Sequence, residues 1–347
     1  MTLSTECTEM VSFRDDYSAG AHPDILAALG TDNLKTQTPY GEDEYTLDAQ
    51  RLIREKMNSP DAVVHLVASG TMANIVCIGS CLRPHEAVIA ASSGHIVVRE
   101  TGAIEAIGHK IINVAPVEGK LTPKGILKAL QQNTHYPHMS RPRLVYISNT
   151  TEVGTVYTKA ELTAISSVCK SNGLLLHIDG ARLGMALAAE KNDLTLEDYS
   201  HLADIFWIGG TKVGTLLGEA IVVNNPAIRE DFAFHIKQRG GLLAKGRVLG
   251  LQFQALFRSN LFFDLALHAN RTAKALSTGI AEAGYELAAV TESNQVFAIV
   301  PEEAVKRLQR SFEFYIWENL DDGRYIIRLV TSWATEMEAV EKFIRML

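Results

Sequence analysis

Seven short apolar runs recur along the first two thirds of the chain, and most are separated by segments with helical periodicity. The runs cover residues 62–68, 87–91, 110–115, 143–148, 174–179, 205–210 and 219–224. Alternating strand and helix patterns are typical of a parallel sheet covered by helices on both faces. The pattern therefore predicts an α/β fold with a mostly parallel central sheet.

The pattern changes after Pro226. Long helical segments run from about residue 227 to 284, with a break near Gly240–Gly241, and are followed by strand patterns at 295–300 and 324–330 and by helical patterns at 302–309 and 335–346. Such an arrangement indicates a smaller α+β domain. We expect an N-terminal arm over residues 1–23, a large domain over 24–250 and a small C-terminal domain over 251–347.

Composition narrows the classes of function. Hydrophobic residues make up 47% of the 347 residues, and the formal net charge is −7. This charge disfavours nucleic acid or an anionic membrane as a general partner. No stretch reaches the roughly 18 apolar residues that a membrane span needs, and the start of the chain lacks the apolar core of a secretory signal.

The cysteines predict a reducing compartment and no metal site. Four cysteines (Cys7, Cys77, Cys81 and Cys169) are too few for a disulfide scaffold in a chain of this length. Cys77 and Cys81 share a helix face, but two ligands make a poor metal site, so we expect core packing. We accordingly expect a cytoplasmic protein.

The stretch Leu174–Gly184, LLLHIDGARLG, places a carboxylate at the end of an apolar strand. Ligands of open parallel sheets bind beyond the carboxyl ends of the strands. Because an isolated buried carboxylate is costly, Asp179 needs a positive partner there. A plain helix cap, or a pair with Arg182, would use the same residue.

Two further loops carry candidate chemistry. Lys212 follows the apolar strand IFWI within the small-residue turn GGTKVG, where desolvation would lower the pKa of its amine and favour reaction with an aldehyde. Ser69, Gly70 and Thr71 precede an apolar helix, whose free N–H groups suit a phosphate. Taken singly, a surface lysine and an ordinary helix cap explain these loops as well.

The order of the three loops is more specific than any one of them. A phosphate turn, a strand-end Asp and a lysine after a later strand is the order found in fold-type I pyridoxal-phosphate enzymes. Nearly end to end, the chain resembles the threonine aldolase branch of these aspartate aminotransferase-like enzymes. The matching stretches are FRDDYSAGAHP, YGED, SGTMAN, GHIVVRETGAIEAIGHK, HIDGARLG and GGTKVGTLLGEA.

The resemblance implies a role for each matching residue, with pyridoxal 5′-phosphate (PLP) as cofactor. Lys212 matches the Schiff-base lysine, Asp179 the partner of the ring nitrogen, and His95 the histidine stacked on the ring. Ser69, Gly70 and Thr71 match the phosphate loop, to which the implied cofactor set adds Arg182, Lys237 and Lys245. The implied substrate set, which includes the pair holding the substrate carboxylate (Arg182 and Arg328), is Asp16, Tyr40, Thr151, Arg182 and Arg328.

Two features of the resemblance leave alternatives open. Many relatives carry a histidine near the substrate hydroxyl where Thr151 stands here, so the general base is open, and His95 or a water that it orients is the first candidate. Lys237 and Lys245 lie in a basic segment around Gly240–Gly241. This segment is either a solvated helix face or a loop that reaches a neighbouring subunit's phosphate, as in a homodimer or homotetramer.

The expected activity is therefore cleavage of an L-threonine or allo-threonine type amino acid into glycine and an aldehyde. Two alternatives stand beside it. One is β-elimination or transamination with the same cofactor, and the other is a catalytically silent binding relative. Retention of Lys212, Asp179 and Arg328 argues against the silent relative.

Overall fold

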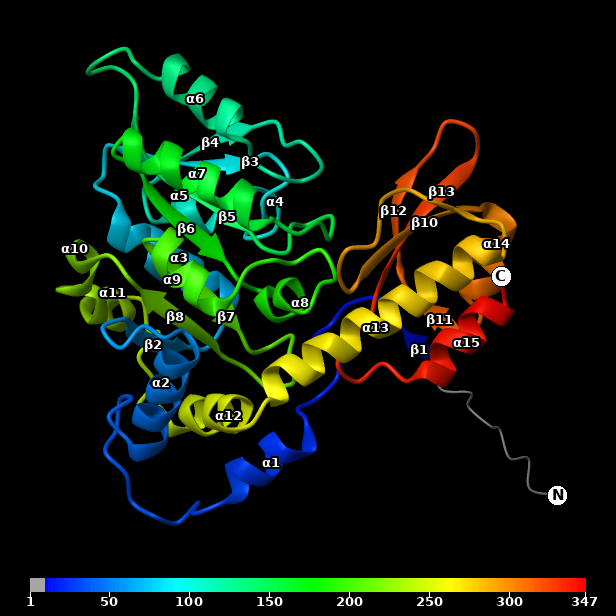
Figure 1. The fold of residues 1–347 in the computed structure, drawn as a ribbon, viewed down its shortest axis with the longest axis horizontal. Coiled ribbons are helices and arrows are strands. Elements are labelled where there is room, and N and C mark those ends of the chain that lie inside the picture. Colours follow the sequence, from blue (N-terminus) through cyan, green and yellow to red (C-terminus); the bar gives the residue numbers. More distant parts are fainter. Residues whose placement is uncertain (1–9) are drawn as a thin grey trace.

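The computed structural model describes residues 10–347, so the first nine residues of the predicted arm, with Cys7, lie outside the described part. A seven-stranded sheet and a four-stranded sheet lie side by side, joined by one long helix, α13 (Leu261–Glu282) (Figure 1). Within residues 10–347, no helix combines the length and the apolar character needed to cross a membrane.

The large sheet contains all seven strands predicted from the apolar runs. Its order is β2-β8-β7-β6-β5-β3-β4. The bounds are β2 (Val63–Val67), β3 (Glu86–Ala91), β4 (Lys110–Val114), β5 (Arg141–Ser148), β6 (Leu175–Asp179), β7 (Ile205–Gly209) and β8 (Glu219–Val223). Only β8 runs against its neighbours, so the prediction of a mostly parallel sheet is confirmed.

Helices cover both faces of this sheet because alternate strand residues point to opposite sides. On β7, Phe206 and Ile208 join one apolar core, whereas Ile205 and Trp207 join the other. The first core includes residues from α1 (Pro23–Gly30), α2 (Glu44–Lys56), α6 (Pro123–Gln132), α7 (Lys159–Ser171), α8 (Leu183–Leu187), α9 (Leu196–Leu202) and α12 (Arg247–Arg258). The second includes residues from α3 (Gly70–Cys81), α4 (His95–Val98), α5 (Ala103–Ala106), α10 (Pro226–Arg229) and α11 (Phe232–Gln238). Cys77 is buried in the second core and Cys81 packs against it, which confirms their predicted packing role.

The small sheet has the order β12-β13-β10-β9 and is antiparallel. Its bounds are β9 (Glu286–Leu287), β10 (Gln295–Pro301), β12 (Tyr315–Asn319) and β13 (Arg324–Val330), with helices α14 (Glu302–Leu308) and α15 (Met337–Arg345). In the arm, β1 (Val11–Ser12) pairs with β11 (Phe312–Glu313), and Phe13 enters the small core. The two strands form a separate two-stranded sheet, and the arm is thereby anchored on the small core.

Helix α13 contributes to both parts of the molecule. Phe262 and Ala266, near its start, belong to the core of the large sheet, whereas Leu276 and Ile280, near its end, belong to the small core. The proposed domain boundary near residue 250 falls inside α12, which packs on α1 and α2. The division of the chain into domains stays a prediction.

Candidate active site

A pocket of about 320 Å³ opens where β5, β6 and β7 end and where α3 begins. Its volume lies at the lower end of the range typical of small-molecule sites. Residues from the arm, from α3 and from the loops after β5, β6 and β7 line it: Tyr17, Ala68, Ser69, Gly70, Thr71, His95, Ser148, Thr150, Thr151, Glu152, Asp179, Ala181, Arg182, Trp207, Thr211, Lys212, Leu217 and Glu219. Eight of the thirteen predicted site residues line this cavity, among them Asp179 and Lys212. A ninth, Asp16, forms a hydrogen bond with Arg182 of the lining.

The Asp179 carboxylate is buried at the end of β6 and has hydrogen bonds to both oxygens. Asn74 Nδ2 and Tyr146 Oη donate to Oδ2 at 2.9 and 2.7 Å, and the backbone N–H of Ala181 donates to Oδ1 at 3.0 Å. No side chain fits at Gly180, because a Cβ there would collide with the Trp207 carbonyl oxygen of β7. The turn thus holds the carboxylate at the pocket wall. Arg182 does not pair with Asp179 in this arrangement.

Asn74 links this carboxylate to His95. Its amide nitrogen also donates to Glu100 Oε1 at 2.8 Å, and Glu100 Oε1 lies 2.7 Å from His95 Nδ1. Its amide oxygen accepts from Trp207 Nε1 at 3.1 Å. A carboxylate oxygen only accepts hydrogen bonds, so the contact with Glu100 places the proton of the His95 ring on Nδ1. One buried amide therefore sets the positions of two predicted site residues.

Lys212 is enclosed in the pocket wall. Burial, together with the nearby Arg182 guanidinium, lowers the pKa of its amine, while Asp16, Asp179 and Glu219 act in the opposite direction. Burial raises the pKa of Glu219 to about 8, although Thr211 Oγ1 and the Gly210 N–H donate to its two oxygens at 2.8 and 2.9 Å. A lysine with a lowered pKa is the form that reacts with aldehydes.

The start of α3 forms a second wall. Ser69 is the N-cap, and its hydroxyl accepts from the Met72 N–H at 3.3 Å. The N–H groups of Gly70 and Thr71 have no partner within the helix, because they belong to its first turn. A Cβ at Gly70 would lie 2.9 Å from the Trp207 ring, so glycine allows the helix start to approach the floor of the pocket. This wall can bind an anion.

Two arginines and an aspartate stand where the arm and the small sheet meet the pocket. Asp16 accepts from Arg182 Nε at 2.7 Å and from Arg182 Nη2 at 2.9 Å. Burial alone would raise the pKa of Asp16, but Arg182 and Lys212 outweigh it and hold the pKa below its ordinary value. Arg328, on β13, donates from Nε and Nη2 to the neutral amide oxygen of Gln295 at 3.0 and 2.6 Å. Burial, and then the proximity of Arg182, lowers the pKa of Arg328 to about 10.

Three further predicted residues lie on the outer surface, away from the pocket. The Lys237 ammonium lies 4.4 Å from the centre of the Tyr40 ring, and the Tyr40 N–H donates to the Ala244 carbonyl at 3.1 Å, next to Lys245. Tyr40, Lys237 and Lys245 thus gather on a surface formed by the α11–α12 connection and the segment before α2. Within one chain, they do not reach the cavity.

Sequence reasoning missed several residues of the pocket network. Asn74, Glu100 and Glu219 lie in the matching stretches given above, but no role was predicted for them. No role was predicted for Tyr146 or Glu152 either. Glu219 reaches the pocket because β8 is antiparallel: its first residue pairs with Gly209, the last residue of β7. The signal available in the sequence was the single acidic residue, Glu219, directly before the apolar run of β8.

Comparisons with known proteins agree with this geometry. A solved structure of a threonine aldolase from Leishmania major is 47% identical, with a TM-score of 0.95, and the match covers 96% of this chain and 98% of that one. A low specificity L-threonine aldolase from Pseudomonas aeruginosa is 33% identical over 339 residues, which are 96% of each chain. Aspartate aminotransferase from Thermus thermophilus shares the fold at 14% identity, with a TM-score of 0.71.

The model of the β-eliminating lyase family matches residues 13–303, a span that contains the arm, the Asp179 turn and the Lys212 loop. The chain belongs to the β-eliminating lyase family.

Proposed function

We propose that this protein is a PLP-dependent aldehyde-lyase that cleaves L-threonine or allo-threonine type amino acids into glycine and an aldehyde. The observation that carries the proposal is the placement of Asp179 and Lys212 in one pocket, one wall of which is the start of α3. The full-length similarity to threonine aldolases supports the same reaction.

The residues of the pocket fit PLP. The buried Lys212 amine would hold its aldehyde carbon, and the hydrogen-bonded Asp179 carboxylate would keep a proton on its ring nitrogen. The Ser69, Gly70 and Thr71 wall would bind the phosphate. His95, fixed by Glu100, would pack on the ring. When bound, PLP supplies a sink for the electron pair released from the substrate's α-carbon.

The two arginines give the pocket its preference for amino acids. Arg328 donates two hydrogen bonds to a neutral amide, so its positive charge is available for the substrate carboxylate. Arg182 would hold the same carboxylate from the other side, with Asp16 fixing its guanidinium plane. Holding the carboxylate fixes the rotation of the substrate and thus selects which bond to the α-carbon is broken. Thr151, in the pocket lining, would contact the β-substituent.

We also propose that the active unit is a homo-oligomer, a dimer at least and in our proposal a tetramer. Lys212 and Arg182 are the only lysine and arginine that line the pocket in residues 10–347, and neither belongs to the phosphate wall. Tyr40, Lys237 and Lys245 lie on an outer surface from which they can complete the phosphate site of a second copy. The proposed compartment is the cytoplasm, which suits the free thiols of Cys77, Cys81 and Cys169.

An amino-acid panel with separate detection of glycine and aldehyde tests the proposed reaction. L-threonine or L-allo-threonine should give equal amounts of glycine and acetaldehyde, only when PLP is present. Formation of a keto acid and ammonia, or of a transaminated product, in place of glycine would contradict it.

A further inference from the structure

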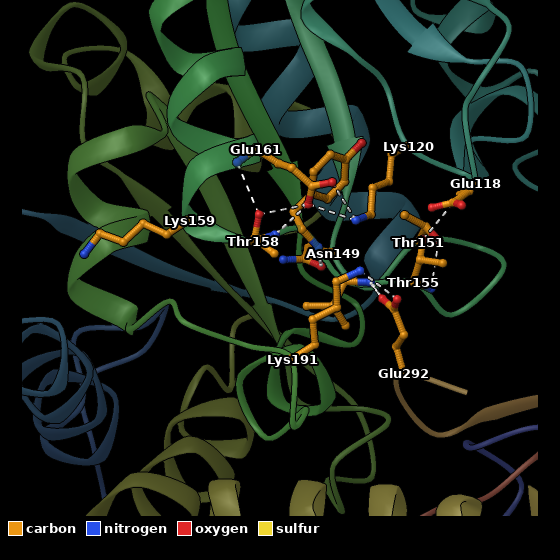
Figure 2. Close-up of polar contacts among 12 residues, drawn as sticks. Glu118, Lys120, Asn149, Thr151, Thr155, Thr158, Lys159, Glu161, Lys191 and Glu292 are labelled. Carbon is orange, nitrogen blue, oxygen red and sulfur yellow. Dashed lines mark hydrogen bonds and ion pairs between the residues drawn. The ribbon is translucent and has the colours of Figure 1, made fainter. Parts of the chain in front are cut away.

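The loop after β5 explains what Thr151 does in place of a histidine. Thr155 Oγ1 donates to the Glu118 carbonyl at 2.8 Å, which uses the only proton of the Thr155 hydroxyl (Figure 2). The 2.7 Å contact between the two threonine hydroxyls therefore has Thr151 as donor. Thr151 Oγ1 also accepts from the Thr155 N–H at 3.2 Å. Its hydroxyl proton is committed within the loop, so Thr151 is not the group that handles the substrate's proton.

Contacts with the rest of the chain hold this loop in place. The Asn149 side chain donates to Tyr199 Oη at 2.6 Å, and the Val156 N–H donates to Glu292 Oε2 at 2.7 Å. Glu292 is in turn bound by Lys191 at 2.7 Å (Figure 2). Glu152 follows Thr151 in this loop, so its backbone is fixed by contacts on both sides.

Glu152 differs from the other carboxylates that line the pocket. Both oxygens of Asp179 and both oxygens of Glu219 accept hydrogen bonds. Glu152 Oε1 accepts from Ser148 Oγ at 2.7 Å and from the His95 N–H at 2.9 Å. Within residues 10–347, no other residue forms a hydrogen bond with its Oε2. Glu152 is therefore the lining carboxylate with a free oxygen.

From this geometry we propose that Glu152, the residue after Thr151, accepts the proton of the substrate's β-hydroxyl group. The proposal rests on the proposed function. The β-hydroxyl O–H bond breaks and its proton moves to Glu152 Oε2, while the O–H electron pair forms the aldehyde C=O bond. The Cα–Cβ bond breaks, and its electron pair stays with the α-carbon of the glycine product, for which PLP, when bound, would serve as the electron sink. Glu152 then releases the proton to water, and the α-carbon of glycine takes up a proton from the solvent, so no oxidant or reductant is needed.

The electrostatic setting of Glu152 suits this role. Burial raises its pKa, while the hydrogen bond from Ser148 partly offsets that rise. The ionisable groups that interact with it are Tyr146 on β5, Asp179 on β6 and Tyr157 after the loop, and the backbone N–H of His95 donates to it. A base works best when its pKa is near the working pH, and a raised carboxyl pKa moves Glu152 in that direction.

The test compares Glu152→Gln with Glu118→Gln, a matched change at an exposed glutamate whose side chain is outside the pocket. Glu152→Gln should lower kcat for threonine cleavage by about 10²–10⁴-fold. It should keep the PLP absorbance and the exchange of the glycine α-proton in D2O, because that exchange has no β-hydroxyl to deprotonate. Glu118→Gln should match the parent in all three measurements.

The pH dependence gives a second readout. A base must be ionised, so kcat/KM of the parent should fall as the pH drops through the raised pKa of Glu152. This acidic limb should vanish in Glu152→Gln and persist, at lower activity, in Glu152→Asp. Infrared titration of the cofactor-free protein should show one protonated carboxyl band fewer in Glu152→Gln than in the parent.

The outcomes separate the two proposals. Cleavage by Glu152→Gln at the parent rate would overturn the role of Glu152, as would loss of α-proton exchange together with cleavage. An acidic limb that disappears in His95→Phe and stays in Glu152→Gln would assign the base to His95. If the parent itself neither cleaves threonine nor exchanges the glycine proton, the proposed function fails, whatever Glu152 does.

Discussion

The two charged walls of the pocket are built in opposite ways. On the wall formed by the large sheet, the Asp179 carboxylate receives hydrogen bonds from Asn74, Tyr146 and the Ala181 N–H, so it is already held in place. On the wall formed by the small sheet, Arg328 donates only to the neutral Gln295 amide and lies near a second guanidinium. The first wall is preorganised, whereas the second carries positive charge that an anionic ligand would neutralise.

From this difference we infer that the first wall binds the cofactor and the second binds the substrate. A fixed carboxylate suits a resident cofactor, because a preorganised group needs no rearrangement when the reaction begins. Two neighbouring arginines suit a substrate that enters and leaves, because its carboxylate offsets their mutual repulsion while it is bound. Changes on the first wall should therefore damage chemistry, and changes on the second should damage substrate binding as well.

The largest expected effect is that of Lys212→Ala. Removal of the amine takes away the group that would hold the aldehyde carbon of PLP, so threonine cleavage should fall to the background rate. Glycine formation measured with saturating PLP checks this. Turnover within a factor of about ten of the parent, which is only about 1.4 kcal/mol of barrier, would contradict it.

Asp179→Asn tests the preorganised wall directly. The amide keeps the shape but lacks the negative charge that would retain the proton on the cofactor ring, so kcat should drop by about a hundredfold or more. PLP should remain bound, as its absorbance will show. A parent-like kcat with the cofactor in place would exclude this role for Asp179.

Arg328→Ala tests the substrate wall. Loss of a charge-assisted contact in a closed site typically costs at least about 2 kcal/mol, which is roughly thirtyfold in kcat/KM. The KM for threonine should rise and the absorbance of bound PLP should stay unchanged. If the absorbance changes and KM does not, Arg328 belongs to the cofactor wall instead.

The smallest effect concerns stability and pH. Glu219 has a pKa of about 8 in the folded chain, well above its ordinary value, so the folded chain keeps a proton that the unfolded chain has released. Stability should therefore fall as the pH rises from roughly 5 towards 8, by at most about 1.4 kcal/mol per pH unit. Glu219→Gln should remove this contribution to the pH dependence of stability.

Chemical unfolding of the cofactor-free parent and of Glu219→Gln measures the effect. The free energies of unfolding should be similar near the acidic end of the range, and the variant should become the more stable protein as the pH rises. A constant difference across the range would show that Glu219 is ionised in the folded state.

The same comparison shows what could be predicted from the sequence. Asp179 and Lys212 each follow an apolar strand within a few residues, so local pattern alone placed them at the ends of strands. The seven strands were found for the same reason. By contrast, Asn74 acts through contacts with Glu100, Asp179 and Trp207, which are distant in sequence. No local pattern reports such pairings.

The position of Glu219 could not be predicted because it depends on the direction of a strand. The apolar run at β8 was found, but not its antiparallel direction, which brings Glu219 to the pocket edge. The sequence pattern singled out Thr151 and not its neighbour Glu152. Only the hydrogen bonds of the loop show that the Thr151 hydroxyl is occupied and that Glu152 Oε2 is free. The surface position of Tyr40, Lys237 and Lys245 also depends on packing that one chain's sequence does not reveal.

The central claim is that Lys212 holds PLP in this pocket, and one measurement tests it most directly. Borohydride reduction of the purified protein with PLP fixes the cofactor to the lysine that binds it, and peptide mapping then identifies that residue. We expect a single reduced label, on Lys212, and loss of the label when Lys212 is replaced by alanine. A label on any other lysine, or threonine cleavage by a protein that carries no label, would contradict the account.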